Sequence, residues 1–69
     1  MRELAQRMRE LRLERHFKQE EMAKQLELSM SAYCRYERGE REPTASTIVA
    51  MANFFHVSTD YLLGRTDQR

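Results

Sequence analysis

Apolar residues recur every three or four positions along most of this chain, and breaks in that pattern divide it into helical segments. Leu4, Met8 and Leu11 follow the 3.6-residue period of a helix, and neither Gly nor Pro interrupts the chain before Gly39. The pattern therefore predicts a first helix from about Arg2 to Arg15.

The segment from Gln19 to Gly39 predicts two short helices with a sharp turn between them. In each half, apolar residues at i, i+1 and i+4 share one helical face: Met22, Ala23 and Leu26 in the first, and Ala32, Tyr33 and Tyr36 in the second. Leu28 is placed to fill the angle between the helices, and Ser29 is a favourable N-cap for the second. A turn of this length matches the motif whose second helix enters the major groove of DNA.

The remaining part of the chain predicts two more helices. Gly39 and Pro43 break the pattern, and Thr44 then caps a fourth helix. Its inner face carries Ile48, Met51, Ala52 and Phe55. Ser58 caps a short fifth helix, Thr59 to Leu63, which Gly64 closes. We therefore expect an all-α domain of five helices over residues 1–64, followed by a polar, frayed tail over 65–69.

The size and composition limit the possible functions. With 69 residues, the chain makes one small domain with little room for a buried catalytic cavity. It is 41% hydrophobic and 33% charged, which is typical of a globular protein, and no apolar run approaches the roughly 20 residues that span a bilayer. A single Cys and the lack of a secretory signal favour a reducing, cytoplasmic location without membrane association.

The charges are unevenly distributed along a chain whose net charge is only +1. Residues 1–18 hold six basic side chains against three acidic ones, whereas residues 19–28 hold one against three. A nearly neutral protein can therefore still present a basic face to a polyanion.

Taken together, these residues resemble the lambda-repressor and Cro type of helix-turn-helix domain, the xenobiotic-response-element-like group found in bacterial and phage transcriptional regulators. The resemblance runs from about Leu4 to Gly64. It rests on single positions and three strings: Arg12, Gln19-Glu20-Glu21, Ala23, Leu26, Ser29, Arg35-Tyr36-Glu37-Arg38-Gly39, Pro43 and Val57-Ser58-Thr59-Asp60-Tyr61-Leu62-Leu63-Gly64. It implies a lambda-repressor-like fold that binds double-stranded DNA as a homodimer on a two-fold operator, usually as a repressor.

Carried over by position, the resemblance implies a set of DNA-binding residues in and around a recognition helix at 29–38: Gln19, Ser29, Met30, Ser31, Arg35, Arg38 and Arg41. Met30, Ser31 and Arg35 hold the positions that reach base edges, and a guanidinium such as that of Arg35 can pair with guanine N7 and O6. Gln19, Ser29, Arg38 and Arg41 hold the positions of phosphate contacts. The alternatives are an exposed Arg35 paired with a nearby Glu, and Arg38 and Arg41 that serve only surface solvation.

The resemblance also implies a structural ion pair between Arg12 and Glu37, which would join the first helix to the end of the recognition helix. Three positions depart from the family, because His16, Glu27 and His56 stand where it usually has a left-handed Gly. Lys18 replaces a Ser or Thr cap and should weaken the start of the second helix. These departures affect the expected stability and leave the DNA-facing residues unchanged.

Other classes of function have weaker support in the sequence. No arrangement of His, Cys and carboxylates suggests an enzyme or a metal site, and no cofactor or small-molecule ligand is indicated. The alternatives to a regulator are an antitoxin or another protein-interaction module on the same fold, or the DNA-binding part of a longer regulator. For a homodimer we expect contacts within 48–63, with Val49, Phe54 and Tyr61 as exposed candidates.

Overall fold

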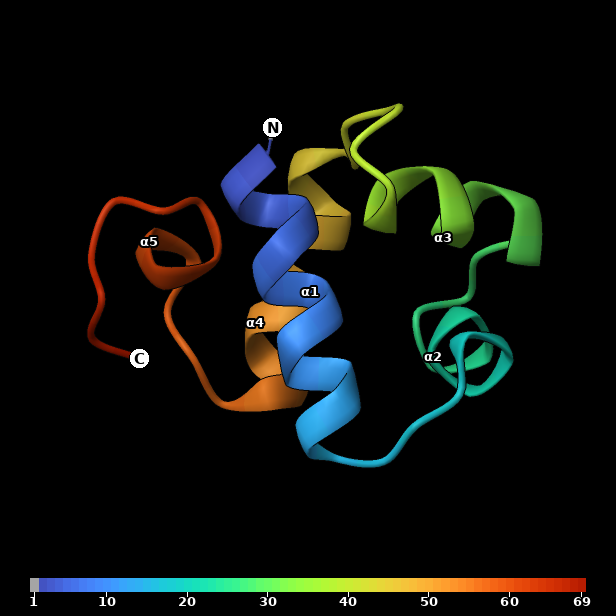
Figure 1. Cartoon of the computed structure of the whole chain (residues 1–69), viewed down its shortest axis with the longest axis horizontal. Helices are drawn as coiled ribbons and strands as arrows, with labels where there is room; N and C mark the ends of the chain where they lie inside the picture. The colour runs from blue at the N-terminus through green and yellow to red at the C-terminus, as the bar shows by residue number, and fades with distance from the viewer. Residues whose placement is uncertain (1) are drawn as a thin grey trace.

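The computed structural model describes residues 2–69, and within them the chain forms helices joined by short turns (Figure 1). The helices are α1 (Arg2–Glu14), α2 (Gln19–Gln25), α3 (Met30–Glu37), α4 (Ala45–Phe55) and α5 (Thr59–Leu62). The described residues contain five helices and no strand, which confirms the predicted all-α class. Each predicted helix is present, with ends within a residue or two of the expected ones.

The helix starts follow the predicted caps. The hydroxyl oxygens of Ser29, Thr44 and Ser58 each accept a hydrogen bond from the backbone N–H three residues later. Lys18 makes no such bond from its side chain, as its replacement of a hydroxyl cap predicts. Instead the Glu21 carboxylate accepts the Lys18 backbone N–H at 2.8 Å, so half of a capping box still closes the start of α2.

Left-handed backbone occurs at the three positions where the family resemblance suggested it. His16, Glu27 and His56 have φ values of 60°, 57° and 57°. Each follows a helix and lets the chain turn sharply into the next segment. A side chain with a Cβ is strained in this conformation by about 1–2 kcal/mol per residue, so these turns are built at some cost in stability.

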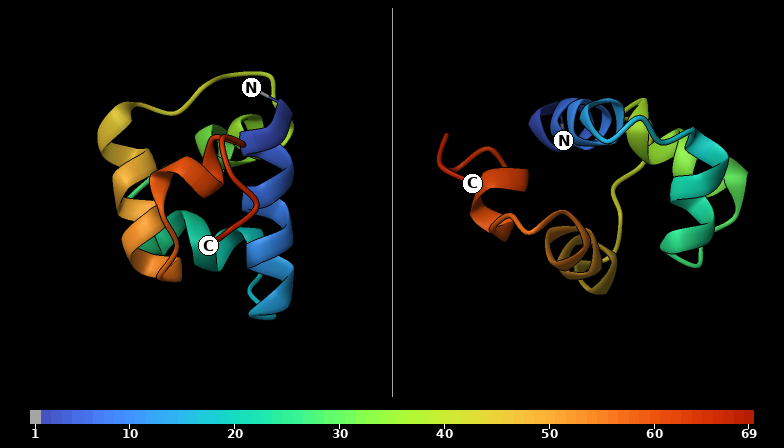
Figure 2. Two further views of the ribbon diagram at one scale, coloured as in Figure 1. Left: turned by 90° about the vertical axis from the view of Figure 1, so that its left-hand side faces the viewer. Right: turned by 90° about the horizontal axis from the view of Figure 1, so that it is seen from below.

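The core lies where α1 meets the other helices. Met8, Met22, Met51 and Leu62 come from four different helices and are completely buried, and Tyr33 of α3 is 1% exposed. Figures 1 and 2 show α1 running between α5 on one side and the α2–α3 pair on the other, with α4 behind it. α1 therefore fixes the position of the helix-turn-helix relative to the rest of the domain.

The tail at 65–69 is packed against the domain, so the expectation of a frayed tail was wrong. Arg7 of α1 donates to the Thr66 carbonyl at 2.6 Å and to the Asp67 carboxylate at 2.9 Å. Arg69 forms two hydrogen bonds with the Glu14 carboxylate, and the Ser58 backbone N–H donates to the Arg69 carbonyl at 2.7 Å. Composition alone suggested disorder, whereas partners distant in sequence hold this segment.

Two of the three candidates for an exposed dimer contact are not exposed. Tyr61 is 8% exposed, and the guanidinium carbons of Arg7 and Arg69 lie 4.2 and 5.4 Å from the centre of its ring. Phe54 is partly buried and its ring lies 5.6 Å from that of Phe17. Only Val49 is exposed, at 49%. The helical pattern placed Tyr61 and Phe54 off the inner stripe, but it could not show that α1, its turn and the tail cover them.

Candidate nucleic-acid interface

The geometry of the helix-turn-helix is set by a few local contacts. The Leu28 backbone N–H donates to the Ala23 carbonyl at 2.8 Å, which closes the turn after α2, and Leu28 packs against the core. The Ser29 hydroxyl accepts the Ala32 N–H at 3.1 Å and starts α3. Tyr33, one turn into α3, anchors its inner face in the core. The opposite face of α3 is consequently directed to solvent.

That outer face carries the three residues predicted to reach base edges. Met30 is 45% exposed, and Ser31 and Arg35 are also exposed. Within residues 2–69 Arg35 forms no hydrogen bond or ion pair through its side chain. The alternative in which a nearby Glu occupies Arg35 is therefore not realised, and its guanidinium donors are available to a ligand.

Two further arginines flank the end of α3. Arg38 caps the helix, and its Nε lies 3.3 Å from the Cys34 carbonyl and 3.5 Å from the Glu40 carboxylate. Its side chain remains 63% exposed, so these long contacts hold it weakly. Arg41 lies in the loop between α3 and α4, is exposed, and forms no ion pair with any other residue of 2–69.

Gln19 at the start of α2 is turned toward the protein. Its amide nitrogen donates to Glu37 Oε1 at 3.2 Å, and its amide oxygen accepts from the Cys34 thiol at 3.5 Å. The side chain thus links the beginning of α2 to α3. Its predicted phosphate contact stays a prediction, and no pattern in the sequence indicated this internal role.

The predicted ion pair between Arg12 and Glu37 is formed and nearly buried. Arg12 Nε and Nη2 donate to Glu37 Oε2 and Oε1 at 2.9 and 2.8 Å, and Nη1 donates to the Phe17 carbonyl at 2.9 Å. The side chains are 11% and 4% exposed. This two-pronged pairing joins α1, the turn after it and the last residue of α3, so it holds the recognition helix in position.

The electrostatics of this pair follow from its surroundings. Burial alone would raise the pKa of Glu37, but hydrogen bonds from Arg12, Tyr33 and Gln19 outweigh it and hold the pKa below its usual value. The bond to Glu37 likewise raises the pKa of Arg12. Burial, followed by the nearby Glu37 carboxylate, raises the pKa of Tyr33. At neutral pH the pair is therefore fully charged.

Other kinds of site have no support within the described residues. Nowhere in 2–69 do three or more His, Cys, Asp or Glu side chains gather as they would around a metal ion. No helix in that part of the chain is long and apolar enough to cross a membrane.

Two short helices joined by a sharp turn, α2 and α3, with the outer face of α3 exposed, form a helix-turn-helix. The chain belongs to the Cro/C1-type helix-turn-helix family, because the family model described as "Helix-turn-helix" matches residues 8–62. This confirms the resemblance read from the sequence and the predicted fold class.

Known relatives agree with this assignment. The HTH-type transcriptional regulator ImmR of Bacillus subtilis (strain 168) is 36% identical over 93% of this chain and 50% of its own length. AnsR, an HTH-type transcriptional regulator of the same organism, is 33% identical over 91% of this chain and 54% of its own. The cryptic phage CTXphi transcriptional repressor RstR of Vibrio cholerae is 35% identical over 74% of this chain and 46% of its own.

The chain spans about half the length of the curated relatives it matches. These relatives are transcriptional regulators, a class of proteins that are not enzymes, so the prediction that this chain is not an enzyme is confirmed.

Proposed function

We propose that this domain binds double-stranded DNA in a sequence-specific manner through α3 and acts in transcription regulation as a repressor. The observation that carries the proposal is the exposed face of α3, where Met30, Ser31 and Arg35 point outward while the Arg12–Glu37 pair fixes the helix from behind. The name of RstR, a transcriptional repressor, supports this direction of regulation.

The exposed residues divide into two roles in this proposal. Met30 offers an apolar contact such as a thymine methyl, and Arg35 offers a two-pronged contact to guanine. Ser29, Arg38, Arg41 and the start of α2 at Gln19 bind phosphates and set the orientation of the domain. Only a few side chains can contact the DNA bases, since α3 has only eight residues.

We further propose a homodimer on a two-fold operator. One short helix reads only about 4 to 6 base pairs, so two half-sites about one helical turn apart are needed for useful specificity. Val49 on α4 is the remaining exposed apolar candidate for the dimer contact. A monomer found by sedimentation on operator DNA would contradict this part of the proposal.

Because the chain covers only about half of its relatives, a second candidate is that residues 1–64 are the DNA-binding part of a longer regulator. In that case regions outside this sequence would supply the sensing or dimerising function. Measuring whether these 69 residues alone dimerise on DNA separates the two candidates.

The proposal is tested by selecting bound sites from random duplex DNA and then comparing two variants on selected and scrambled duplexes. Arg35→Ala should cost about 1–3 kcal/mol on the selected site, relax preference at one base pair per half-site, and change nonspecific affinity much less. Arg41→Ala should weaken all duplexes alike and flatten the salt dependence by about one unit per subunit. Equal losses for Arg35→Ala on both duplexes would contradict its assigned role, and wild-type protein that enriches no sequence would contradict the proposed function.

A further inference from the structure

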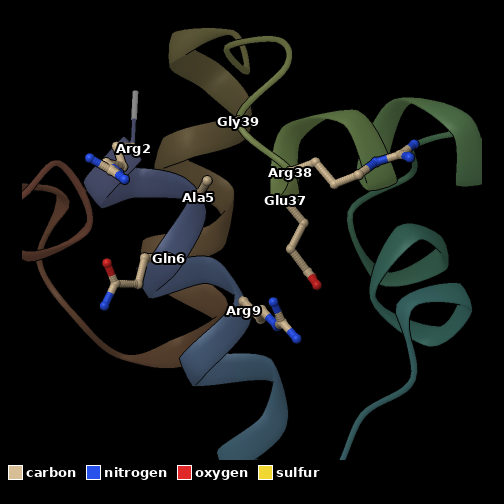
Figure 3. A pocket seen from close by; sticks show the side chains of 7 residues that line it. All are labelled: Arg2, Ala5, Gln6, Arg9, Glu37, Arg38 and Gly39. Carbon is tan, nitrogen blue, oxygen red and sulfur yellow. The ribbon is translucent and has the colours of Figure 1, made fainter.

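A groove lies between the first half of α1 and the end of α3, and Arg38 is the one residue of its lining that was assigned to DNA above (Figure 3). Its volume is about 510 Å³. Arg2, Gln6 and Arg9 line one wall, and Arg38 with Gly39 lines the other. Arg38 is thus shared between this groove and the face of α3.

The groove follows from the helical period and from one close approach. Arg2, Gln6 and Arg9 are spaced at i, i+4 and i+7, so they project from a single exposed face of α1. At the other wall the chain leaves α3 through Gly39, whose φ is +75°. A Cβ at Gly39 would lie 3.7 Å from the Cβ of Ala5, so the end of α3 rests directly beside α1.

The charge of the groove is positive and largely uncompensated. Neither Arg2 nor Arg9 forms an ion pair with any other residue of 2–69. Arg38 has only its two long contacts, at 3.3 and 3.5 Å. The single carboxylate in the lining, Glu37, is already neutralised by Arg12. Glu10, which is not part of the lining, lies 3.5 Å from the Gln6 amide and offsets part of the positive charge.

Three guanidinium groups around an open groove form a surface suited to phosphate. Each presents a planar fork of N–H donors that matches the oxygens of a phosphodiester. In Figure 3 the side chain of Arg9 is directed toward Glu37, the side chain of Arg38 extends along α3 away from α1, and the guanidinium of Arg2 points away from α3. Because Arg38 is 63% exposed and weakly held, it can turn toward an anion by giving up only these long contacts.

We propose that this groove binds a backbone phosphate of the DNA duplex adjacent to the bases read by α3, with Arg9 as its main contact and Arg2 and Arg38 beside it. The inference rests on the proposed function, since it extends the same interface. It implies that Arg2 and Arg9 of α1 continue the line of phosphate contacts that Arg38 makes along the DNA backbone.

The test compares Arg9→Gln with the matched control Arg65→Gln. Both substitutions remove one exposed positive charge, but Arg65 follows α5, on the other side of α1 from α3 (Figure 1). Arg9→Gln should bind selected and scrambled duplexes severalfold more weakly, and its dependence of log K on log salt should be shallower by about 0.9 per subunit. Arg65→Gln should match the wild type at 0.1 M salt, where charges more than about 10 Å apart are screened. Equal thermal melts confirm that both variants are folded.

Ethylation interference on the selected site locates the contact. Among the phosphates whose ethylation weakens wild-type binding, one per half-site should no longer do so with Arg9→Gln. Identical interference patterns, or equal salt slopes for Arg9→Gln and Arg65→Gln, would overturn the groove assignment while leaving the proposed function intact. The assignment would also be overturned if Arg9→Gln lost NMR shifts induced by inorganic phosphate but bound duplexes like the wild type, because the groove would then serve a free anion. Wild-type protein that binds no duplex would instead refute the proposed function itself.

Discussion

The ion pair between Arg12 and Glu37 makes a quantitative prediction about stability. Glu37→Ala removes a carboxylate that accepts two hydrogen bonds from Arg12 and one from Gln19, and it leaves the Arg12 guanidinium, 11% exposed, without its counter-charge. Breaking a buried pair in this way typically costs about 3–5 kcal/mol. Arg12 keeps its bond to the Phe17 carbonyl, so we expect a loss of roughly 2–4 kcal/mol in the free energy of unfolding.

A loss of this size would be a large part of the domain's total free energy of unfolding. A chain of 69 residues has a free energy of unfolding of roughly 3–10 kcal/mol, at about 0.05–0.15 kcal/mol per residue. Glu37→Ala should therefore shift the midpoint of a urea melt strongly toward lower concentration at an unchanged slope. Glu10→Ala is the matched control, because Glu10 is exposed on α1, and its effect should stay within about 0.5 kcal/mol.

A double-mutant cycle separates the interaction free energy of the Arg12–Glu37 pair from the effect of lost packing. Arg12→Met and Glu37→Met should each destabilise the domain, since each leaves a buried charge unpaired. The double variant should lose much less than the two single losses combined, because no buried charge remains. A loss below about 1 kcal/mol for Glu37→Ala, or additive losses in the cycle, would refute the view that this pair is desolvated and holds α3 in place.

The structure makes three further predictions. Because the pKa of Glu37 is lower in the folded protein, its ionisation stabilises the fold fully above the unfolded pKa of about 4.3, and this stabilisation is lost as the pH falls through the lower folded pKa. In melts between pH 5 and 2, the free energy of unfolding should therefore fall less steeply with decreasing pH for Glu37→Gln than for the wild type. Glu27→Gly should stabilise the domain by roughly 0.5–1 kcal/mol in urea melts, since its φ of 57° strains a side chain, whereas Glu27→Ala should not. Arg7→Gln should release the tail, seen as faster amide hydrogen exchange at the backbone N–H of Ser58, and unchanged exchange would contradict the packing described.

The helices and the exposed face of α3 could be predicted from neighbouring residues in the chain. The 3.6-residue spacing of Leu4, Met8 and Leu11 and the hydroxyl caps at Ser29 and Thr44 depend only on neighbouring residues, so they can be predicted without a fold. The outward face of α3 follows from the same period, and the left-handed turns and the Arg12–Glu37 pair came from the family resemblance.

Which of the exposed and apolar residues have partners depends on how the helices and the tail pack together. Tyr61 was expected at the surface but is covered by two arginines from other segments: Arg7 belongs to α1, and Arg69 belongs to the tail after α5. The inward turn of Gln19 and the groove between Arg9 and Arg38 likewise depend on how α1 and α3 pack. Helical periodicity fixes the direction of a side chain around its own axis, whereas its burial and its charge partners depend on the segment that packs against it.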